Sequence, residues 1–113
     1  MGMIENFEAM LASGKDSALL RFSLGNAYLQ SADQTANTSQ RNIAITHLCA
    51  AVKFDNDYSA AWKLLGKAYA GNGNSDDAKA AYAEGIRAAT AKGDKQAAKE
   101  MTVFLKRLNN VSI

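Results

Sequence analysis

Apolar residues recur at helical spacing along the whole chain, and this pattern predicts helices and no strands. Within each apolar stripe the residues lie three and four positions apart, so they share one face of a helix. Glycine and polar stretches such as Lys92-Gly93-Asp94 separate the stripes and end the helices. The expected helices cover residues 3–12, 17 to about 30, 39 to about 54, 58–70, 75–91 and 94–109. We therefore expect an all-α protein.

Polar residues suited to capping stand before several of these helices. We expect Asp16 to be the N-cap of the second helix, Ser39 that of the third and Ser75 that of the fifth. Asp76 and Asp77 then fall in the first turn of the fifth helix, where negative charge meets the positive end of the helix dipole. This position accounts for the two carboxylates without a catalytic role, since no partner base accompanies them.

The stretch from Trp62 to Tyr82 carries the most specific pattern. Its defining residues are W-x2-L-G-x2-Y at Trp62, Leu65, Gly66 and Tyr69, followed by A-x3-aromatic at Ala78 and Tyr82. Gly66 stands beside the apolar stripe of its helix, where a missing side chain lets a second helix approach closely. Ala78 and Tyr82 are four apart on the next helix and are placed to fill that opening.

A less complete copy of the pattern lies upstream. Leu24, Gly25 and Tyr28 repeat L-G-x2-Y, Ala44 and Leu48 repeat the pair on the second helix, and Arg21 stands where Trp62 stands in the other copy. Ala44 and Ala78 are 34 positions apart, whereas Gly25 and Gly66 are 41 apart.

The surplus residues of the first copy fall at positions 31–39, a small and polar stretch. We expect a surface loop there. A functional loop is the alternative, but lengthening a loop costs only about 0.6 kcal/mol per doubling, so the insertion needs no function to be tolerated.

The two copies resemble the tetratricopeptide repeat, a helix-turn-helix unit of about 34 residues. The resemblance covers residues 17–91 and implies a short α-solenoid within a single domain of residues 1–113. Its parts would be an N-terminal helix (3–12), repeat 1 with its insertion (17–58), repeat 2 (59–92) and a C-terminal capping helix (94–109). Gly85 replaces the alanine usual in the family, which indicates a tight contact at that position. Because about three repeats are normally needed, the flanking helices must supply the missing burial.

The resemblance also implies a concave groove that holds a peptide or helix of a partner protein. The groove positions of the family fall on Leu19, Phe22, Asn26 and Leu29 in the first copy and on Lys63 and Lys67 in the second. An alternative for Leu19 and Phe22 is that they pack under the N-terminal helix. Lys63 and Lys67 are four apart and repel each other by a few tenths of a kcal/mol, so the free protein should gain nothing from them. An acidic or C-terminal carboxylate ligand would relieve that repulsion.

Composition narrows the remaining functions. The formal net charge of +2 is too small to argue for nucleic acid or an anionic membrane. No stretch approaches the roughly 18 apolar residues of a membrane span, and the N-terminus lacks the features of a signal peptide, so we expect a cytoplasmic protein without a membrane partner. Nucleic-acid binding through the basic residues of the C-terminal helix is a lesser alternative, because no aromatic residue interleaves with them. These basic residues are Lys92, Lys95, Lys99, Lys106 and Arg107.

Residues that could carry catalysis or bind a metal are few. His47 and Cys49 are the single histidine and the single cysteine, and two positions apart on a helix they point in nearly opposite directions. We expect His47 at the surface, Cys49 as a small buried residue, and no metal, cofactor or internal disulfide. The sequence thus predicts a noncatalytic protein-binding module, with a self-assembling structural scaffold as the alternative. It favours a monomer over a homodimer.

Overall fold

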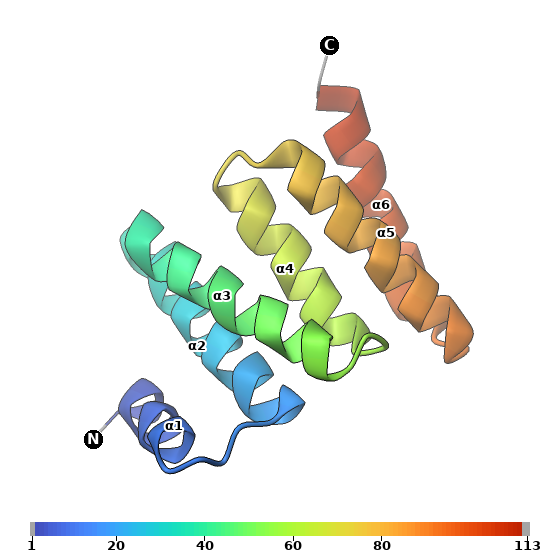
Figure 1. The fold of residues 1–113 in the computed structure, drawn as a ribbon. Coiled ribbons are helices and arrows are strands. Elements are labelled where there is room, and N and C mark those ends of the chain that lie inside the picture. Colours follow the sequence, from blue (N-terminus) through green and yellow to red (C-terminus); the bar gives the residue numbers. More distant parts are fainter. Residues whose placement is uncertain (1, 112–113) are drawn as a thin grey trace. The chain divides into compact units, whose positions relative to one another are not determined.

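The computed structural model describes residues 2–111, without the side chain of Val111, and this part of the chain contains six α-helices and no strand (Figure 1). The helices are α1 (Met3–Ala12), α2 (Ala18–Thr35), α3 (Thr38–Phe54), α4 (Ser59–Gly71), α5 (Ser75–Ala91) and α6 (Lys95–Val111). The prediction of an all-α fold is confirmed.

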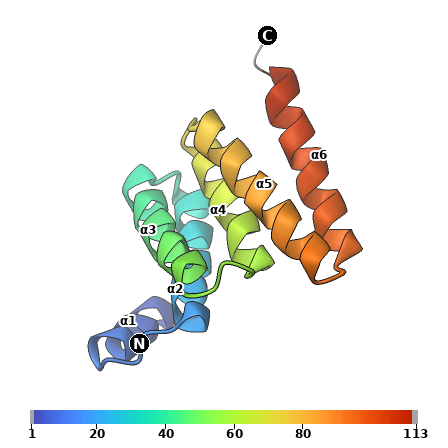
Figure 2. The same ribbon diagram turned by 45° about the vertical axis from the view of Figure 1, so that its right-hand side comes forward.

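The helices form two compact units, Met1–Asp55 and Asn56–Ile113. In the first unit α2 and α3 lie side by side as an antiparallel pair, and α1 packs against α2. In the second unit α4 and α5 form the corresponding pair, and α6 packs against α5 (Figure 2). Each unit therefore holds one helix pair and one flanking helix.

Each helix pair is tightly packed at the glycine of its motif. A Cβ atom built on Gly25 would lie 2.5 Å from the Cγ of Leu48, and one built on Gly66 would lie 2.6 Å from the ring of Tyr82. No side chain fits at such distances unless its neighbour moves. The predicted close contact between Gly66 and the fifth helix is thus confirmed, and Gly25 makes the equivalent contact in the first unit.

The core of the second unit depends on α6. Met101 is fully buried there together with Ala78, Tyr82 and Ala89 of α5. The rings of Tyr82 and Phe104 are 5.6 Å apart, and burial raises the pKa of the Tyr82 phenol to about 12.

The contact at Gly85 is as tight as its sequence position indicates. A Cβ atom there would overlap the sulfur of Met101 and lie 3.0 Å from the Cβ of Trp62. Side chains rather than a second backbone therefore occupy the space that the family's usual alanine would fill.

Three of the expected caps are wrong by one or two positions. The hydroxyl of Ser17, not Asp16, accepts from the amide of Leu20 at 3.0 Å, because the Asp16 carboxylate binds Arg21 instead. Asn37, not Ser39, caps α3 by accepting from the Gln40 amide at 3.1 Å. At α5 the N-cap is Asn74, without a side-chain cap bond, and Ser75 is the first helical residue.

The expected loop at residues 31–39 is also wrong, because most of it is helical. α2 continues to Thr35 and ends at Ala36, whose φ of 52° is the left-handed conformation common after helices. Ala32 is fully buried, which anchors the additional turn. The Ser31 hydroxyl donates to Gln40 Oε1 at 2.8 Å, so the lengthened ends of α2 and α3 are joined. The surplus residues therefore extend a helix pair.

The two flanking helices have nearly the predicted bounds, but α1 covers its apolar residues only in part. Ile4, Phe7 and Leu11 are half-buried, whereas Met3 is 60% and Met10 42% exposed. α6 continues to Val111, two residues beyond its predicted end at 109, and residues 112–113 lie outside the described part of the chain.

Replacing Gly66 tests the close approach of α4 and α5. Alanine in place of a mid-helix glycine normally adds about 1 kcal/mol of stability. Here Gly66→Ala should instead lower the free energy of unfolding, and Gly66→Leu should lower it by about 1–3 kcal/mol or more, because the rigid Tyr82 ring fills the space. Denaturant unfolding measures both. Ala70→Leu, at an exposed position of α4, is the matched control and should be nearly neutral. Unchanged stability of Gly66→Leu would contradict the close contact.

Candidate protein-binding surfaces

The residues predicted to line a groove lie on α2 and α4, the first helix of each pair, so each set is placed within its own unit. On α2, Leu19 is 67% exposed, whereas Phe22 and Asn26 are half-buried. Leu29 is only 4% exposed and belongs to the core of the first unit. The α2 surface that a ligand can reach is therefore Leu19 with the open parts of Phe22 and Asn26.

Leu19 borders a small pocket between α1 and α2, which we call the Leu19 pocket. Its volume is about 160 Å³, and it is lined by Phe7, Met10, Lys15, Ser17, Leu19, Leu20 and Ser23. Cofactor and drug sites usually measure about 300–1,000 Å³, so this pocket has room for one side chain of a partner and not for a cofactor. α1 forms one wall of the pocket but leaves Leu19 open, so the alternative in which α1 covers Leu19 is wrong.

The two lysines of α4 differ in their surroundings. Lys63 Nζ donates to Glu100 Oε2 at 2.5 Å, which links α4 to α6 and lowers the pKa of the Glu100 carboxyl. Lys67 is exposed, and the structure records no ion pair for it within residues 2–111. Lys63 thus already has a carboxylate partner within the protein, which the sequence analysis did not predict. The sequence could not reveal this pair, because Glu100 lies 37 positions away.

A polar cluster joins the three helices of the first unit. Arg21 of α2 makes two hydrogen bonds to the Asp16 carboxylate, at 2.8 and 3.0 Å, and its Nη1 lies 3.1 Å from Nδ1 of His47 on α3. Glu8 of α1 lies 3.6 Å from the other ring nitrogen of His47. The His47 ring stacks on Tyr28 at 5.7 Å. His47 is only 7% exposed, so its expected surface position is wrong.

The surroundings of His47 favour its neutral form. Burial, and after it the charge of Arg21, lower the pKa of the imidazole, while Glu8 and Asp16 act in the opposite direction. Arg21 can only donate, so Nδ1 must accept and the proton of the neutral ring sits on Nε2. Within residues 2–111 no group of three or more His, Cys, Asp or Glu side chains is arranged to hold a metal ion. The cluster therefore has the character of a structural network.

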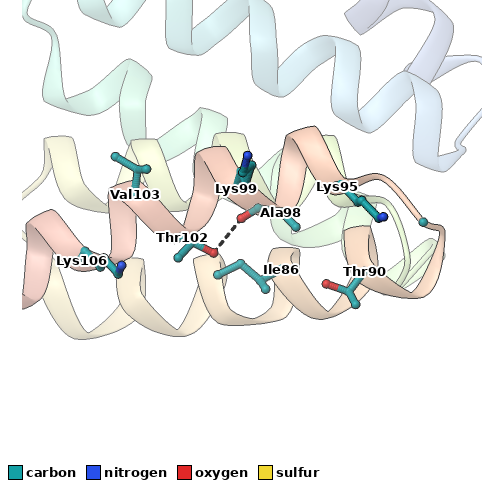
Figure 3. Close-up of a pocket in the computed structure, with 9 residues that line it drawn as sticks. Ile86, Thr90, Lys95, Ala98, Lys99, Thr102, Val103 and Lys106 are labelled. Carbon is teal, nitrogen blue, oxygen red and sulfur yellow. Dashed lines mark hydrogen bonds between the residues drawn. The ribbon is translucent and has the colours of Figure 1, made fainter.

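A larger groove runs between α5 and α6, and we call it the α5–α6 groove (Figure 3). Its volume is about 750 Å³. The lining residues are Ile86, Thr90, Gly93, Lys95, Ala98, Lys99, Thr102, Val103 and Lys106. The sequence analysis considered the lysines of this side of α6 only as a lesser candidate for nucleic-acid binding and did not predict an apolar groove beside them. The available signal was Val103, an apolar residue among the lysines of that side, which the structure leaves 45% exposed.

No helix in the described part of the chain is long and apolar enough to cross a membrane.

The chain is similar to known proteins, although no family model matches it. TPR repeat-containing protein PA0015 of Pseudomonas aeruginosa is 50% identical over 107 residues, which make up 95% of this chain and 95% of that protein. The solution structure of protein BPP2914 from Bordetella parapertussis is 44% identical with a TM-score of 0.78, and the match covers 97% of this chain and 90% of that one.

The neutral state of His47 predicts how stability depends on pH. The pKa of His47 is lowered in the folded protein, so between that value and about 6.5 the unfolded chain binds more protons. The free energy of unfolding should therefore decrease as the pH falls from about 7.5 to about 5.5. Urea unfolding at both pH values measures this.

His47→Gln serves as the control, because His47 is the single histidine and glutamine can still accept from Arg21. In the variant the free energy of unfolding should change less between about pH 7.5 and about pH 5.5 than it does in the wild type. An equal pH dependence in the variant would contradict the assignment.

Proposed function

The chain belongs to the tetratricopeptide repeat (TPR) family, and from this membership we propose that it is a noncatalytic module that binds a peptide or helix of a partner protein. Helical repeats of this kind present one face of consecutive helices as a binding surface. The observation that carries the proposal for this chain is the Leu19 pocket, which combines an exposed leucine, an apolar interior and a nearby cation.

The Leu19 pocket has the features of an anchor site. Leu19 and Met10 expose apolar surface on either side of it, and covering such surface stabilises a complex by roughly 25 cal/mol per Å². Interfaces concentrate their binding energy where one large side chain enters a pocket of this kind. We therefore assign the pocket to an apolar side chain of the partner.

The charges near the proposed site favour an acidic partner segment. Lys15 lines the Leu19 pocket and is exposed, and no ion pair is recorded for it in the part of the chain that the structure describes. Further along α2, the half-buried amide of Asn26 offers both a donor and an acceptor. A carboxylate of the partner, from a side chain or a C-terminus, would pair with Lys15 while its apolar neighbour enters the pocket.

The second unit offers Lys67 to the same class of partner. Lys63 is already bound to Glu100, so a ligand carboxylate would have to compete for it. Lys67 is the better candidate of the predicted pair, because it is exposed and its charge is uncompensated among residues 2–111. The cytoplasm remains our proposed location for this binding.

A self-assembling scaffold is the second function that the exposed apolar residues of the Leu19 pocket would serve. In that case the pocket would be covered by another copy of the chain, and the measured mass would rise with concentration. Variants of Leu19 and Lys67 separate the two functions.

Leu19→Ser should weaken partner binding about tenfold or more, because it removes the exposed wall of the anchor pocket. Partners would be captured with the wild-type protein, identified by mass spectrometry and purified, and their affinity measured by isothermal titration. Ile43→Ser is the matched control: Ile43 is also an exposed aliphatic residue of the first unit, at 41%, and does not line the pocket. It should bind as the wild type does.

Lys67→Ala tests the contribution of the second unit and should weaken binding most at low salt, since exposed charges are screened within about 8–10 Å at physiological ionic strength. Equal affinity of wild type, Leu19→Ser and Lys67→Ala for every captured partner would contradict the proposed surface. Loss of a concentration-dependent mass in Leu19→Ser, measured by sedimentation, would indicate the scaffold instead.

A further inference from the structure

The α5–α6 groove lies entirely in the second unit and shares no residue with the surfaces described above. Ile86 and Ala98 form its apolar floor, and both also pack against the core around Met101. Val103 borders the groove and is 45% exposed. The Thr102 hydroxyl donates to the Ala98 carbonyl at 2.8 Å, so this polar group is satisfied within α6 (Figure 3). The floor of the groove is therefore suited to apolar side chains.

The rim of the groove is positively charged. Lys95, Lys99 and Lys106 line it, and among residues 2–111 no acidic residue does. No ion pair is recorded for these three lysines among residues 2–111, and Figure 3 shows them spread along the length of α6.

The acidic residues of α6 and its N-cap are engaged elsewhere. The carboxylate of Glu100 binds Lys63 of α4, and the carboxylate of Asp94 accepts from the Ala97 amide at the start of the helix. Arg107, the other cation of α6, lies over the ring of Phe104. The charges facing the α5–α6 groove are thus the three lysines.

We propose that the α5–α6 groove binds an acidic amphipathic helix of another protein. The lining residues from Lys95 to Lys106 extend over about 16 Å of α6, the length of about three helical turns. A helix of that length places apolar residues three and four apart on one face, where they reach Ile86, Ala98 and Val103. Acidic residues beside that face meet the lysines, and this charge complementarity fixes the class of partner.

Two other occupants fit the groove less well. A second copy joined through a two-fold axis would set the lysines of one groove against those of the other, which like charges oppose. Single-stranded nucleic acid is usually held by aromatic side chains between the cations, and no aromatic residue lines this groove.

The test uses the full chain and two synthetic helices of about 12 residues, each constrained to be helical. The probe carries leucines at positions three and four apart with glutamates on both flanks, and the control peptide has lysines in place of the glutamates. Binding is measured by fluorescence anisotropy, and the site is read from the methyl NMR signals of Ile86 and Val103. We expect the acidic probe to bind, to shift these two signals and to bind more weakly as salt is added.

Charge reversal within the groove is compared with the same change outside it. Lys99→Glu should weaken binding of the acidic probe by about tenfold or more. Lys53→Glu changes the net charge equally on an exposed residue of α3 and should leave the affinity unchanged. Val103→Ser should also weaken binding, and because Val103 is partly exposed this variant is expected to remain folded.

The proposal is overturned by any of four results. The first is that the Ile86 and Val103 signals do not shift at about 1 mM acidic probe, and the second is that the lysine peptide binds as tightly as the acidic probe. The third is that Lys53→Glu weakens binding of the acidic probe as much as Lys99→Glu does. The fourth is that the protein has a concentration-dependent mass which Lys99→Glu abolishes. The last result would assign the groove to a second copy of this chain. These measurements do not depend on binding at the Leu19 pocket, so the proposal for that pocket and the proposal for the α5–α6 groove can be contradicted independently.

Discussion

The close approach of paired helices at one glycine is the contact on which each unit depends. Gly25 receives Leu48, and Gly66 receives the Tyr82 ring, at distances that leave no room for a side chain. Such a pair buries only the facing apolar stripes of its two helices, and a further apolar stripe on one of them, α5 in the second unit, has to be covered by another helix. In the second unit that stripe is covered by α6, whose Met101 reaches the space left by a further glycine, Gly85. One constraint, close packing at small residues, thus recurs from the helix pair to its flanking helix.

The two copies of the motif solve the same packing problem with different chemistry at their first position. In the second unit the Trp62 indole donates to the Asn56 carbonyl at 2.8 Å, and Arg87 binds the same carbonyl at 2.9 Å. In the first unit Arg21 occupies the equivalent position and joins Asp16 to His47. His47 is the buried member of this cluster, and a buried polar group must be hydrogen-bonded. In its neutral form the ring accepts from Arg21, so the residue at the first position of this copy also satisfies the histidine in the interior.

The helical periodicity predicted the six helices, and the spacing of the motif predicted the close contact at Gly66, because both follow from regular spacing in the sequence. It did not predict which of several neighbouring polar residues would cap a helix. Ser17 caps α2 because Arg21, five positions along the chain, takes the Asp16 carboxylate, and the residue types alone do not decide that competition. The helical extension at residues 31–35 was missed for a related reason, since the burial of Ala32 outweighs the weak helix propensity of its polar neighbours. Among the candidate binding residues, the pattern could not separate Lys67 from Lys63, because the partner of Lys63 lies on a distant helix.

Each unit of this protein has one flanking helix, and that helix decides which apolar surface of the unit remains available to partners. α1 leaves Leu19 open beside an apolar pocket, and α6 covers the core of α5 with one face while its other face borders a groove. If the lysine-lined face of α6 served only solubility, an apolar Val103 and an open floor at Ile86 would add nothing to it. Val103 and Ile86 instead lie among three lysines that have no recorded ion pair within residues 2–111. An acidic amphipathic helix needs this arrangement, because it buries its apolar face at the centre and meets opposite charge at the rim. In this protein the helix that completes the fold also provides a surface on which a further helix can pack.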